Sequence, residues 1–320
     1  MRPPEFWGGT RLRDRLVARA LSPFGAIYGT TVAYKAMHAR PYRSRAKVIC
    51  VGNLTVGGSG KTPVVATIAD ELTRHKRRPF ILTRGYRGSE RGPRLVNIEC
   101  DEASDVGDEA LLLAAHAPVI VSRDRAAGAK LAEEHGADII VMDDGHQNFS
   151  LTKDLSIVVV DGEARFGNGF VVPAGPLRER VAQGLARADT VVLMGACIPL
   201  PFNGPVLRAR LAPAHLNNTL GQPLVAFAGI GRPEKFFRLL RELGAQLAAT
   251  RAFPDHHRYS QAELADLRQL ARGKQAALIA TEKDYARLAP GERSDICVLP
   301  VHARFEDEEA LARLIEVACA

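Results

Sequence analysis

The strongest indication of the fold is the stretch of residues 49–62, Ile49-Cys50-Val51-Gly52-Asn53-Leu54-Thr55-Val56-Gly57-Gly58-Ser59-Gly60-Lys61-Thr62. It is an apolar strand pattern that runs into a glycine-rich loop ending in Gly-Lys-Thr. Glycines let successive backbone N–H groups converge on anionic oxygens, the lysine can reach the β- and γ-phosphates, and the threonine hydroxyl suits Mg²⁺. Residues 64–72 have helical apolar spacing, so the positive end of a helix would face the phosphates. The stretch predicts a phosphate-binding loop made of Thr55, Val56, Gly57, Gly58, Ser59, Gly60, Lys61 and Thr62.

The loop departs from the usual pattern at one position. That pattern has a glycine five residues before the last glycine, and Thr55 stands there in this chain. Gly57 and Gly58 can supply the backbone freedom instead. The competing interpretation is an ordinary glycine-rich turn, but a strand, Gly-Lys-Thr and a helix in this order favour phosphate binding.

Apolar runs and helical patterns alternate after the loop, as a parallel α/β sheet requires. Several runs are apolar throughout, which is typical of strands covered on both faces. The pattern predicts an α/β fold, a P-loop NTPase-type parallel sheet flanked by helices. The expected strands are 47–51, 79–83, 118–122, 138–142, 156–160 and 190–194, and the expected helices are 63–75, 108–116 and 125–135.

A second α/β pattern follows a proline-containing stretch. We predict four parts: an N-terminal segment 1–45, a core 46–197, a linker 198–222 and a smaller C-terminal α/β domain 223–320. Ligands often bind between domains. Within the last part, the expected strands are 224–228, 246–253, 276–280 and 296–301, and the expected helices are 234–243, 261–272 and 308–318.

The composition is that of an ordinary globular protein. The chain has 320 residues, of which 46% are apolar and 25% are charged. Its five cysteines are scattered singly, without metal-ligand spacing, as in reduced cytosolic proteins. This composition excludes a disulfide-stapled scaffold and a disordered chain.

The basic charge is concentrated at the N-terminus. Residues 1–47 hold ten Lys or Arg and two acidic residues, a net charge of +8, whereas the whole chain is +7. Apolar residues lie between these charges with partial helical periodicity, and the uncharged stretch 20–34 contains Pro23 and two glycines. We expect an amphipathic helix that lies on an anionic membrane surface without spanning it. The alternatives are a helix packed on the protein itself, a weak secretory signal, and a nucleic-acid-binding arm, for which no reader motif is present.

Two acidic pairs are candidate chemical groups. Asp143 and Asp144 end an apolar strand pattern, where the aspartate of a Mg-nucleotide site stands. Asp108 and Glu109 begin a helix pattern, where the helix dipole alone favours acids. The functional interpretation is that Asp108 accepts the proton of an attacking hydroxyl. Thr62, Glu109, Asp143 and Asp144 are the predicted Mg²⁺ ligands.

Other polar clusters follow strand patterns. His256 and His257 would point to opposite faces of an extended strand, so we expect no zinc site; a histidine that orients an aspartate or bonds a phosphate fits better. Arg84, Tyr86 and Arg178 lie in segments suited to contacts with a phosphorylated substrate.

Seven motifs in order resemble the tetraacyldisaccharide 4'-kinase family, the lipid A 4'-kinases of Gram-negative bacteria. They are residues 51–63, Thr83-Arg84-Gly85-Tyr86, Gly107-Asp108-Glu109, Asp143-Asp144-Gly145-His146-Gln147, residues 173–179, Phe253-Pro254-Asp255-His256-His257 and Thr281-Glu282-Lys283-Asp284. One departure is His146, where the family pattern leads us to expect an aromatic residue such as phenylalanine; we expect it to alter local packing rather than chemistry.

The resemblance implies a kinase of lipid A and lipopolysaccharide biosynthesis. It would move the γ-phosphate of ATP to the 4'-hydroxyl of a tetraacylated glucosamine disaccharide 1-phosphate, giving lipid IV-A. It further implies that Asp108 is the base, assisted by His256, that Lys61 acts on the transferring phosphate, and that ATP and Mg²⁺ are required. The N-terminal helix would hold the enzyme peripherally on the cytoplasmic face of the inner membrane. We expect no nucleic-acid partner and no obligatory protein partner.

Two other functions remain open from the residues. A membrane-associated ATPase or GTPase switch, or a metallochaperone, has a similar loop, but usually with a lysine where this chain has Val56. A GTPase should also carry Asn/Thr-Lys-x-Asp, and Thr281-Glu282-Lys283-Asp284 has the wrong spacing. The third alternative, a non-enzymatic membrane adaptor, would leave the phosphate loop without a role.

Overall fold

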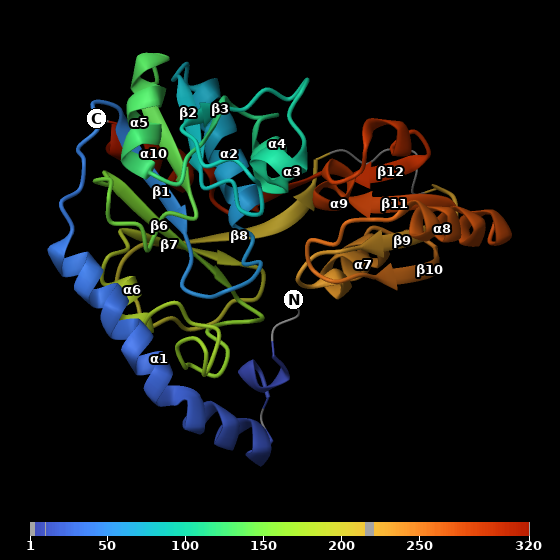
Figure 1. Ribbon diagram of the computed structural model, residues 1–320, viewed down its shortest axis with the longest axis horizontal. Helices are drawn as coiled ribbons and strands as arrows, with labels where there is room; N and C mark the ends of the chain where they lie inside the picture. Colours follow the sequence, from blue (N-terminus) through green and yellow to red (C-terminus); the bar gives the residue numbers. More distant parts are fainter. Residues whose placement is uncertain (1–3, 10, 215–220, 320) are drawn as a thin grey trace. The chain divides into compact units, whose positions relative to one another are not determined.

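A computed structural model describes residues 4–9, 11–214 and 221–319, and the chain divides into two compact units. Among the described residues, the larger unit comprises those within 4–211 and 303–319, and the smaller one comprises those within 212–302. Each unit is built around its own sheet (Figure 1).

The larger unit contains a nine-stranded sheet, in the order β13-β8-β7-β6-β1-β5-β2-β4-β3. Every pairing from β8 through to β4 is parallel, and β3 pairs antiparallel with β4. The strands are β1 (Lys47–Gly52), β2 (Pro79–Thr83), β3 (Arg94–Leu95), β4 (Val119–Val121), β5 (Ile139–Asp143), β6 (Leu155–Asp161), β7 (Thr190–Met194), β8 (Val206–Pro213) and β13 (Val301–Phe305). The helices are η1 (Glu5–Trp7), α1 (Leu12–His38), α2 (Lys61–Arg74), α3 (Ala103–Val106), α4 (Asp108–Leu113), α5 (Arg125–Glu134), α6 (Val181–Leu185) and α10 (Glu308–Cys319).

Helices cover both faces of this sheet, which explains the apolar runs in its central strands. On one face, α2, α4 and α10 pack against Ile49, Val51 and their neighbours on other strands. On the other face, α5 packs against Val48 and Cys50. Each central strand therefore buries both sets of alternating side chains. The predicted parallel α/β fold flanked by helices is confirmed.

The smaller unit has a four-stranded sheet in the order β10-β9-β11-β12, all parallel. Two of its helices begin with side-chain caps: Ser260 and Glu263 form a capping box at α8, and Thr281 caps α9. The strands are β9 (Leu224–Ala228), β10 (Leu247–Ala252), β11 (Ala277–Thr281) and β12 (Ile296–Leu299), and the helices are α7 (Pro233–Glu242), α8 (Gln261–Gly273), α9 (Glu282–Ala286) and η3 (Pro290–Glu292).

The structure divides the chain differently from the four predicted parts. The expected linker 198–222 contains β8, whose strand runs beside β7 in the large sheet. Residues 303–320, expected in the C-terminal domain, return to the larger unit. There Thr67 of α2 exchanges hydrogen bonds with the backbone of Ala303 at 3.2 and 3.3 Å. Burial of the apolar face of α10 against the large sheet is the physical reason for this return. Residues 215–220 of the expected linker lie outside the described residues.

Helix α1 is one continuous helix of 27 residues that includes Pro23. It is the long blue helix along the outer side of the larger unit (Figure 1). Its buried residues are small or medium-sized: Ala18, Gly25, Gly29 and Val32. Its larger apolar side chains are mostly exposed, so its inward side is close-packed and its outward side is apolar. Among the described residues, none of the helices has the length and apolar character needed to cross a membrane.

Candidate active site

The phosphate-binding loop connects β1 to α2. Gly60 takes a left-handed conformation with φ of 87° at the N-cap, so Lys61 and Thr62 form the first turn of α2. Gly57 also has a positive φ of 112°, and a Cβ on Gly57 or Gly58 would meet no atom within 4 Å. The loop therefore presents open backbone at the positive end of a helix, where anions are favoured.

The two aspartates Asp143 and Asp144 stand beside this loop because β5 pairs with β1 in the centre of the sheet, with Val51 opposite Asp143. Asp144 adopts a left-handed backbone conformation with φ of 51°. Its Oδ1 lies 3.5 Å from Nζ of Lys61, and both its oxygens accept hydrogen bonds from Nη1 of Arg178, at 2.9 and 3.0 Å. One carboxylate thus holds two cations at the entrance of the phosphate loop.

Asp143 is deeply buried and points to a different partner. Its Oδ2 accepts a hydrogen bond from Oγ1 of Thr83 at 3.1 Å, and its backbone carbonyl accepts one from Nη2 of the buried Arg125 at 3.0 Å. Burial, together with the nearby carboxylates of Glu109 and Asp144, raises the pKa of Asp143 to about 7. A cation placed beside Asp143 would offset this cost of ionisation.

Asp144 titrates in the opposite direction. Burial again disfavours its charged form, but Lys61 and Arg178 outweigh that effect and hold the pKa of Asp144 well below its usual value. Asp144 is therefore ionised at neutral pH. The two neighbouring carboxyl groups differ because only one of them has two cations in direct contact.

The start of α4 brings a second acidic pair to the same place. Oγ1 of Thr62 lies 3.5 Å from Oε1 of Glu109. Asp108 is buried, and its Oδ1 accepts a hydrogen bond from the backbone N–H of Glu109 at 3.1 Å. Gly107, with φ of 88°, lets the chain turn here, and a Cβ on it would lie 2.6 Å from the carbonyl oxygen of Tyr86. The loop after β2 is therefore packed directly against the start of α4.

The candidate substrate residues occupy two kinds of environment. Arg178 is partly buried and bonded to Asp144 within the site. Arg84 and Tyr86 are exposed on the loop after β2, and the guanidinium of Arg87 lies 5.7 Å from the Tyr86 ring centre. These two exposed side chains stand on the loop that contacts Gly107, one residue before Asp108.

His256 belongs to the smaller unit, whereas Asp108 belongs to the larger one, and their pairing stays a prediction. His256 has a positive φ of 57°. Its Nε2 lies 3.8 Å from Oδ1 of Asp255, and its Nδ1 lies 3.4 Å from Nη2 of Arg287. His257 instead stacks on Phe253 and contacts Glu263 at 2.9 Å.

The motif at 281–284 has a structural role in the smaller unit. Asp284 is completely buried. Its Oδ1 accepts hydrogen bonds from the Gly229 N–H at 2.9 Å, the Tyr259 hydroxyl at 2.8 Å and Nη1 of Arg287 at 2.9 Å. Its Oδ2 accepts one from the Thr281 hydroxyl at 2.6 Å. Because neighbours of its own unit engage both oxygens, Asp284 is not arranged to read a guanine base.

His146 is fully enclosed behind the phosphate loop. Its Nε2 donates to the carbonyl of Gly184 at 2.9 Å, so Nδ1 is the acceptor for the Ser156 hydroxyl at 3.1 Å. Burial lowers the pKa of His146 to about 4, and the ring is neutral at pH 7. Gly52 makes room for it, because a Cβ at that position would lie 2.5 Å from Cβ of His146.

Several supporting residues carry no strong sequence signal. Arg125 stands at the start of α5, where an arginine is usually solvated, yet it is buried beneath Asp143. Glu179 is also buried and accepts hydrogen bonds from Nε2 of Gln147 at 2.9 Å and from Nη2 of Arg187 at 2.5 Å. Both roles depend on neighbours distant in sequence.

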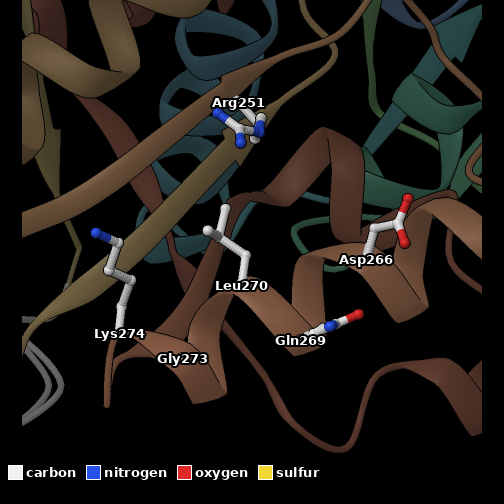
Figure 2. A pocket seen from close by; sticks show the side chains of 6 residues that line it. All are labelled: Arg251, Asp266, Gln269, Leu270, Gly273 and Lys274. Carbon is white, nitrogen blue, oxygen red and sulfur yellow. The ribbon is translucent and has the colours of Figure 1, made fainter.

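The smaller unit also has an open pocket of about 440 Å³. Figure 2 shows its six lining residues, which come from β10 and from α8 and its C-terminal end: Arg251, Asp266, Gln269, Leu270, Gly273 and Lys274. None of them belongs to the predicted site.

The chain is similar to known proteins over nearly its whole length. Residues 17–320 match the family LpxK, described as Tetraacyldisaccharide-1-P 4'-kinase. The chain is 47% identical to a tetraacyldisaccharide 4'-kinase of Paramagnetospirillum magneticum, over 99% of this chain and 98% of that one. It is 45% identical to the Rhodospirillum rubrum protein of the same name, over 99% and 97%. The crystal structure of LpxK from Aquifex aeolicus in complex with ATP matches with a TM-score of 0.79 and 27% identity, covering 95% of this chain and 100% of that one.

Proposed function

The chain belongs to the tetraacyldisaccharide-1-P 4'-kinase family, and we propose that it transfers the γ-phosphate of ATP to the 4'-hydroxyl of a tetraacylated glucosamine disaccharide 1-phosphate. It is a kinase of lipid A biosynthesis, and its product would be lipid IV-A. One observation carries the proposal for the site: Lys61, at the N-terminus of α2, lies 3.5 Å from Asp144 at the entrance of an open phosphate loop.

The loop and Lys61 are proposed to bind the phosphates of ATP. The backbone N–H groups of residues 55–62 and the dipole of α2 favour the negative charge of the β- and γ-phosphates. Lys61 can exchange its contact with Asp144 for the transferring phosphate and stabilise the charge that builds there. The Aquifex relative, whose structure is a complex with ATP, supports ATP as the ligand.

Mg²⁺ is proposed to bind among Thr62, Glu109, Asp143 and Asp144, whose hydroxyl and carboxylate oxygens are the hard ligands that it prefers. Bound there, the ion would neutralise charge on the β- and γ-phosphates. Within the described part of the chain, no three or more His, Cys, Asp or Glu side chains already form a metal-binding group. Such a group is not required, because Mg²⁺ commonly keeps several waters and takes ligands from substrate phosphates.

Asp108 is proposed to accept the proton of the 4'-hydroxyl, with His256 tuning it. The buried carboxyl group of Asp108 is held by the Glu109 N–H, one residue from the proposed metal ligand. A base in this position would act close to the γ-phosphate. Arg178, Arg84 and Tyr86 are proposed to contact the phosphorylated sugar, because guanidinium groups bind phosphate oxygens in a fixed geometry.

The outward side of α1 is proposed to lie on the cytoplasmic surface of the inner membrane. Leu12, Leu16, Ile27 and Tyr34 have 56–74% of their surface exposed and are separated by four, eleven and seven residues, each close to whole helical turns. They therefore share one side of the helix. Arginines at positions 11, 13, 15 and 19 can pair with anionic lipid headgroups around this apolar side. A peripheral position suits an enzyme with one soluble and one lipid substrate.

The test is transfer of labelled γ-phosphate from ATP and Mg²⁺ to tetraacyldisaccharide 1-phosphate in detergent micelles. We expect labelled lipid from the unmodified protein and none above background from Lys61→Ala. ATP hydrolysis without labelled lipid would reject the proposed acceptor and favour a nucleotide-driven switch. Absence of ATP binding would favour the non-enzymatic adaptor.

A further inference from the structure

Helix α1 approaches the body of the larger unit most closely at Gly25. A glycine inside a helix costs about 1 kcal/mol relative to alanine, so a helical glycine needs a reason. At Gly25 the reason is contact, because a Cβ there would lie 2.5 Å from the backbone oxygen of Val171. At Gly29, one turn later, a Cβ would lie 3.9 Å from Cγ2 of Val171, which is ordinary van der Waals distance. The two glycines face the same residue, but only at Gly25 does Val171 leave no room for a side chain.

Val171 lies in a segment that we call the bracing loop, residues 166–178. This loop pairs with the phosphate loop in an antiparallel manner: the Val56 N–H donates to the Pro176 carbonyl, and the Arg178 N–H donates to the Leu54 carbonyl, both at 2.8 Å. A bridge between Thr55 and Leu177 lies between these two bonds. The first half of the phosphate loop is therefore fixed to the bracing loop through its backbone.

Within the bracing loop, Val171 is also paired with Leu177, the residue that bridges to the phosphate loop. Val171 and Leu177 form a parallel bridge, and the Val172 N–H donates to the Leu177 carbonyl at 2.8 Å. Val171, Ala174 and Leu177 are buried. A displacement of Val171 would thus reach residues 54–56 through two steps of backbone pairing.

The N-terminal segment before α1 holds the same loop from another side. Nε1 of Trp7 donates to the Pro173 carbonyl at 3.0 Å, and the Asn168 N–H donates to the Trp7 carbonyl at 2.9 Å. The Asn168 side chain donates to the carbonyls of Phe6 and Ala174, at 3.3 and 2.9 Å. The proposed membrane-facing segment therefore contacts the bracing loop both before and within α1.

The bracing loop ends in the site itself. Arg178, its last residue, contacts Asp144, which in turn contacts Lys61. Continuous contact thus runs from α1 through Val171 to both the backbone of the phosphate loop and the charged groups beside it. Packed cores transmit a displacement of this kind because they contain few voids that could absorb it.

We propose that Val171 is a positioning residue through which α1 sets the geometry of the phosphate loop, so that nucleotide affinity depends on how α1 is seated. The inference rests on the proposed function, since it assigns a regulation to that site. It links the proposed lipid-facing element to ATP binding: seating of α1 and binding of nucleotide stabilise one another, as linkage requires.

The test compares two identical substitutions one turn apart in the full-length protein. Gly25→Ala places a methyl group against the Val171 backbone, whereas Gly29→Ala adds the same group where there is space. We expect Gly25→Ala to raise the Kd for ATP with Mg²⁺, and the KM for ATP, about tenfold, since small displacements remote from a site are costly. Gly29→Ala should keep the original Kd, because its methyl group meets Val171 only at van der Waals distance. The two substitutions favour the helix equally, so Gly29→Ala is a matched control. Calorimetric titration gives the Kd, and circular dichroism and thermal unfolding report the fold.

A purely structural contact predicts a different result. It would lower the unfolding temperature of Gly25→Ala and leave the Kd of the folded protein unchanged. That outcome would overturn the proposal. An equal change of Kd in Gly25→Ala and Gly29→Ala would also overturn it. If Gly25→Ala does not fold, Trp7→Phe serves as the second variant, because it removes the bond to Pro173 and retains an aromatic ring. We expect a rise in Kd of about threefold there, and an unchanged Kd would overturn the proposal. ATP titrations contain no lipid, so failure of lipid phosphorylation would be seen separately.

Discussion

Two carboxylates that follow parallel strands, Asp144 and Asp284, have opposite surroundings. Asp284 is completely buried, and groups of its own unit donate hydrogen bonds to both its oxygens, among them the Gly229 N–H, the Thr281 hydroxyl and the buried guanidinium of Arg287. Asp144 is partly exposed and contacts the ends of two long side chains, Lys61 and Arg178. The side chains of Lys61 and Arg178 can turn toward another anion, whereas the Gly229 N–H is fixed in the backbone and the Arg287 side chain is enclosed.

The difference distinguishes a site from a structural cluster. Both regions contain charged residues after a strand, and sequence motifs mark both. What separates them is whether the charges are neutralised by fixed partners or by mobile partners beside an open backbone loop. In the first case, loss of a charge should unfold the protein; in the second, it should stop the chemistry and leave the fold intact.

The largest expected effect on the rate of phosphoryl transfer comes from substitution of Asp108. We expect Asp108→Ala to reduce phosphoryl transfer by about 10²–10⁴-fold, the usual contribution of a general base, and to change ATP affinity little. His256→Ala should reduce transfer in the same direction, because it is proposed to act through Asp108. Rapid-quench transfer and ATP titration measure the two quantities, with the exposed Asp266→Ala as the control (Figure 2). Unchanged turnover in either variant removes that residue from the mechanism.

The largest expected effect on the free energy of unfolding comes from substitution of Asp284. Asp284→Ala removes the fully buried carboxylate that lies 2.9 Å from the buried guanidinium of Arg287. Breaking a buried ion pair in this way costs about 3–5 kcal/mol. Urea unfolding, with Asp266→Ala again as the control, should show this loss in the free energy of unfolding. A variant as stable as the unmodified protein would show that Asp284 is not a structural group.

The smallest expected effect concerns the outward side of α1. Leu16→Ser combined with Ile27→Ser removes two exposed apolar side chains that we expect to enter the lipid. Full burial of one such side chain is worth about 1.5–3 kcal/mol, so binding to anionic vesicles should fall at least about tenfold. Vesicle sedimentation measures it, and Val317→Ser, at an exposed position of α10, is the matched control. Equal vesicle binding by all three proteins would contradict the membrane role.

The central strands of the large sheet were predictable because each carries its own apolar signal. Burial on both faces makes β1, β5 and β6 continuous apolar runs, and the glycines of the phosphate loop mark the point where β1 ends. The strands toward the two ends of the sheet were not predictable in this way. Only one residue of β8 is buried, and the strand stands in a proline-containing stretch; β3 has only two residues.

The return of residues 303–320 to the larger unit could not be read from local pattern either. The amphipathic face of α10 predicts a helix but not the sheet on which it packs. In the site, Lys61, Thr62 and Asp143 follow from their places at strand and helix ends. A local motif does not show the burial of Arg125, whose hydrogen-bond partner Asp143 is 18 positions away. Nor does it show that the oxygens of Asp284 already accept hydrogen bonds, one of them from Gly229, 55 positions away.

The most direct measurement is phosphoryl transfer and thermal unfolding of Lys61→Ala, determined side by side with the unmodified protein. Arg178 remains to pair with Asp144 in this variant, so we predict an unchanged unfolding midpoint. We predict that transfer of labelled phosphate to the acylated disaccharide falls at least about 10²-fold, because the charge that stabilises the transferring group is lost. Transfer within a few-fold of the unmodified protein, or a loss that only follows the loss of folded protein, would contradict the assignment of the active site.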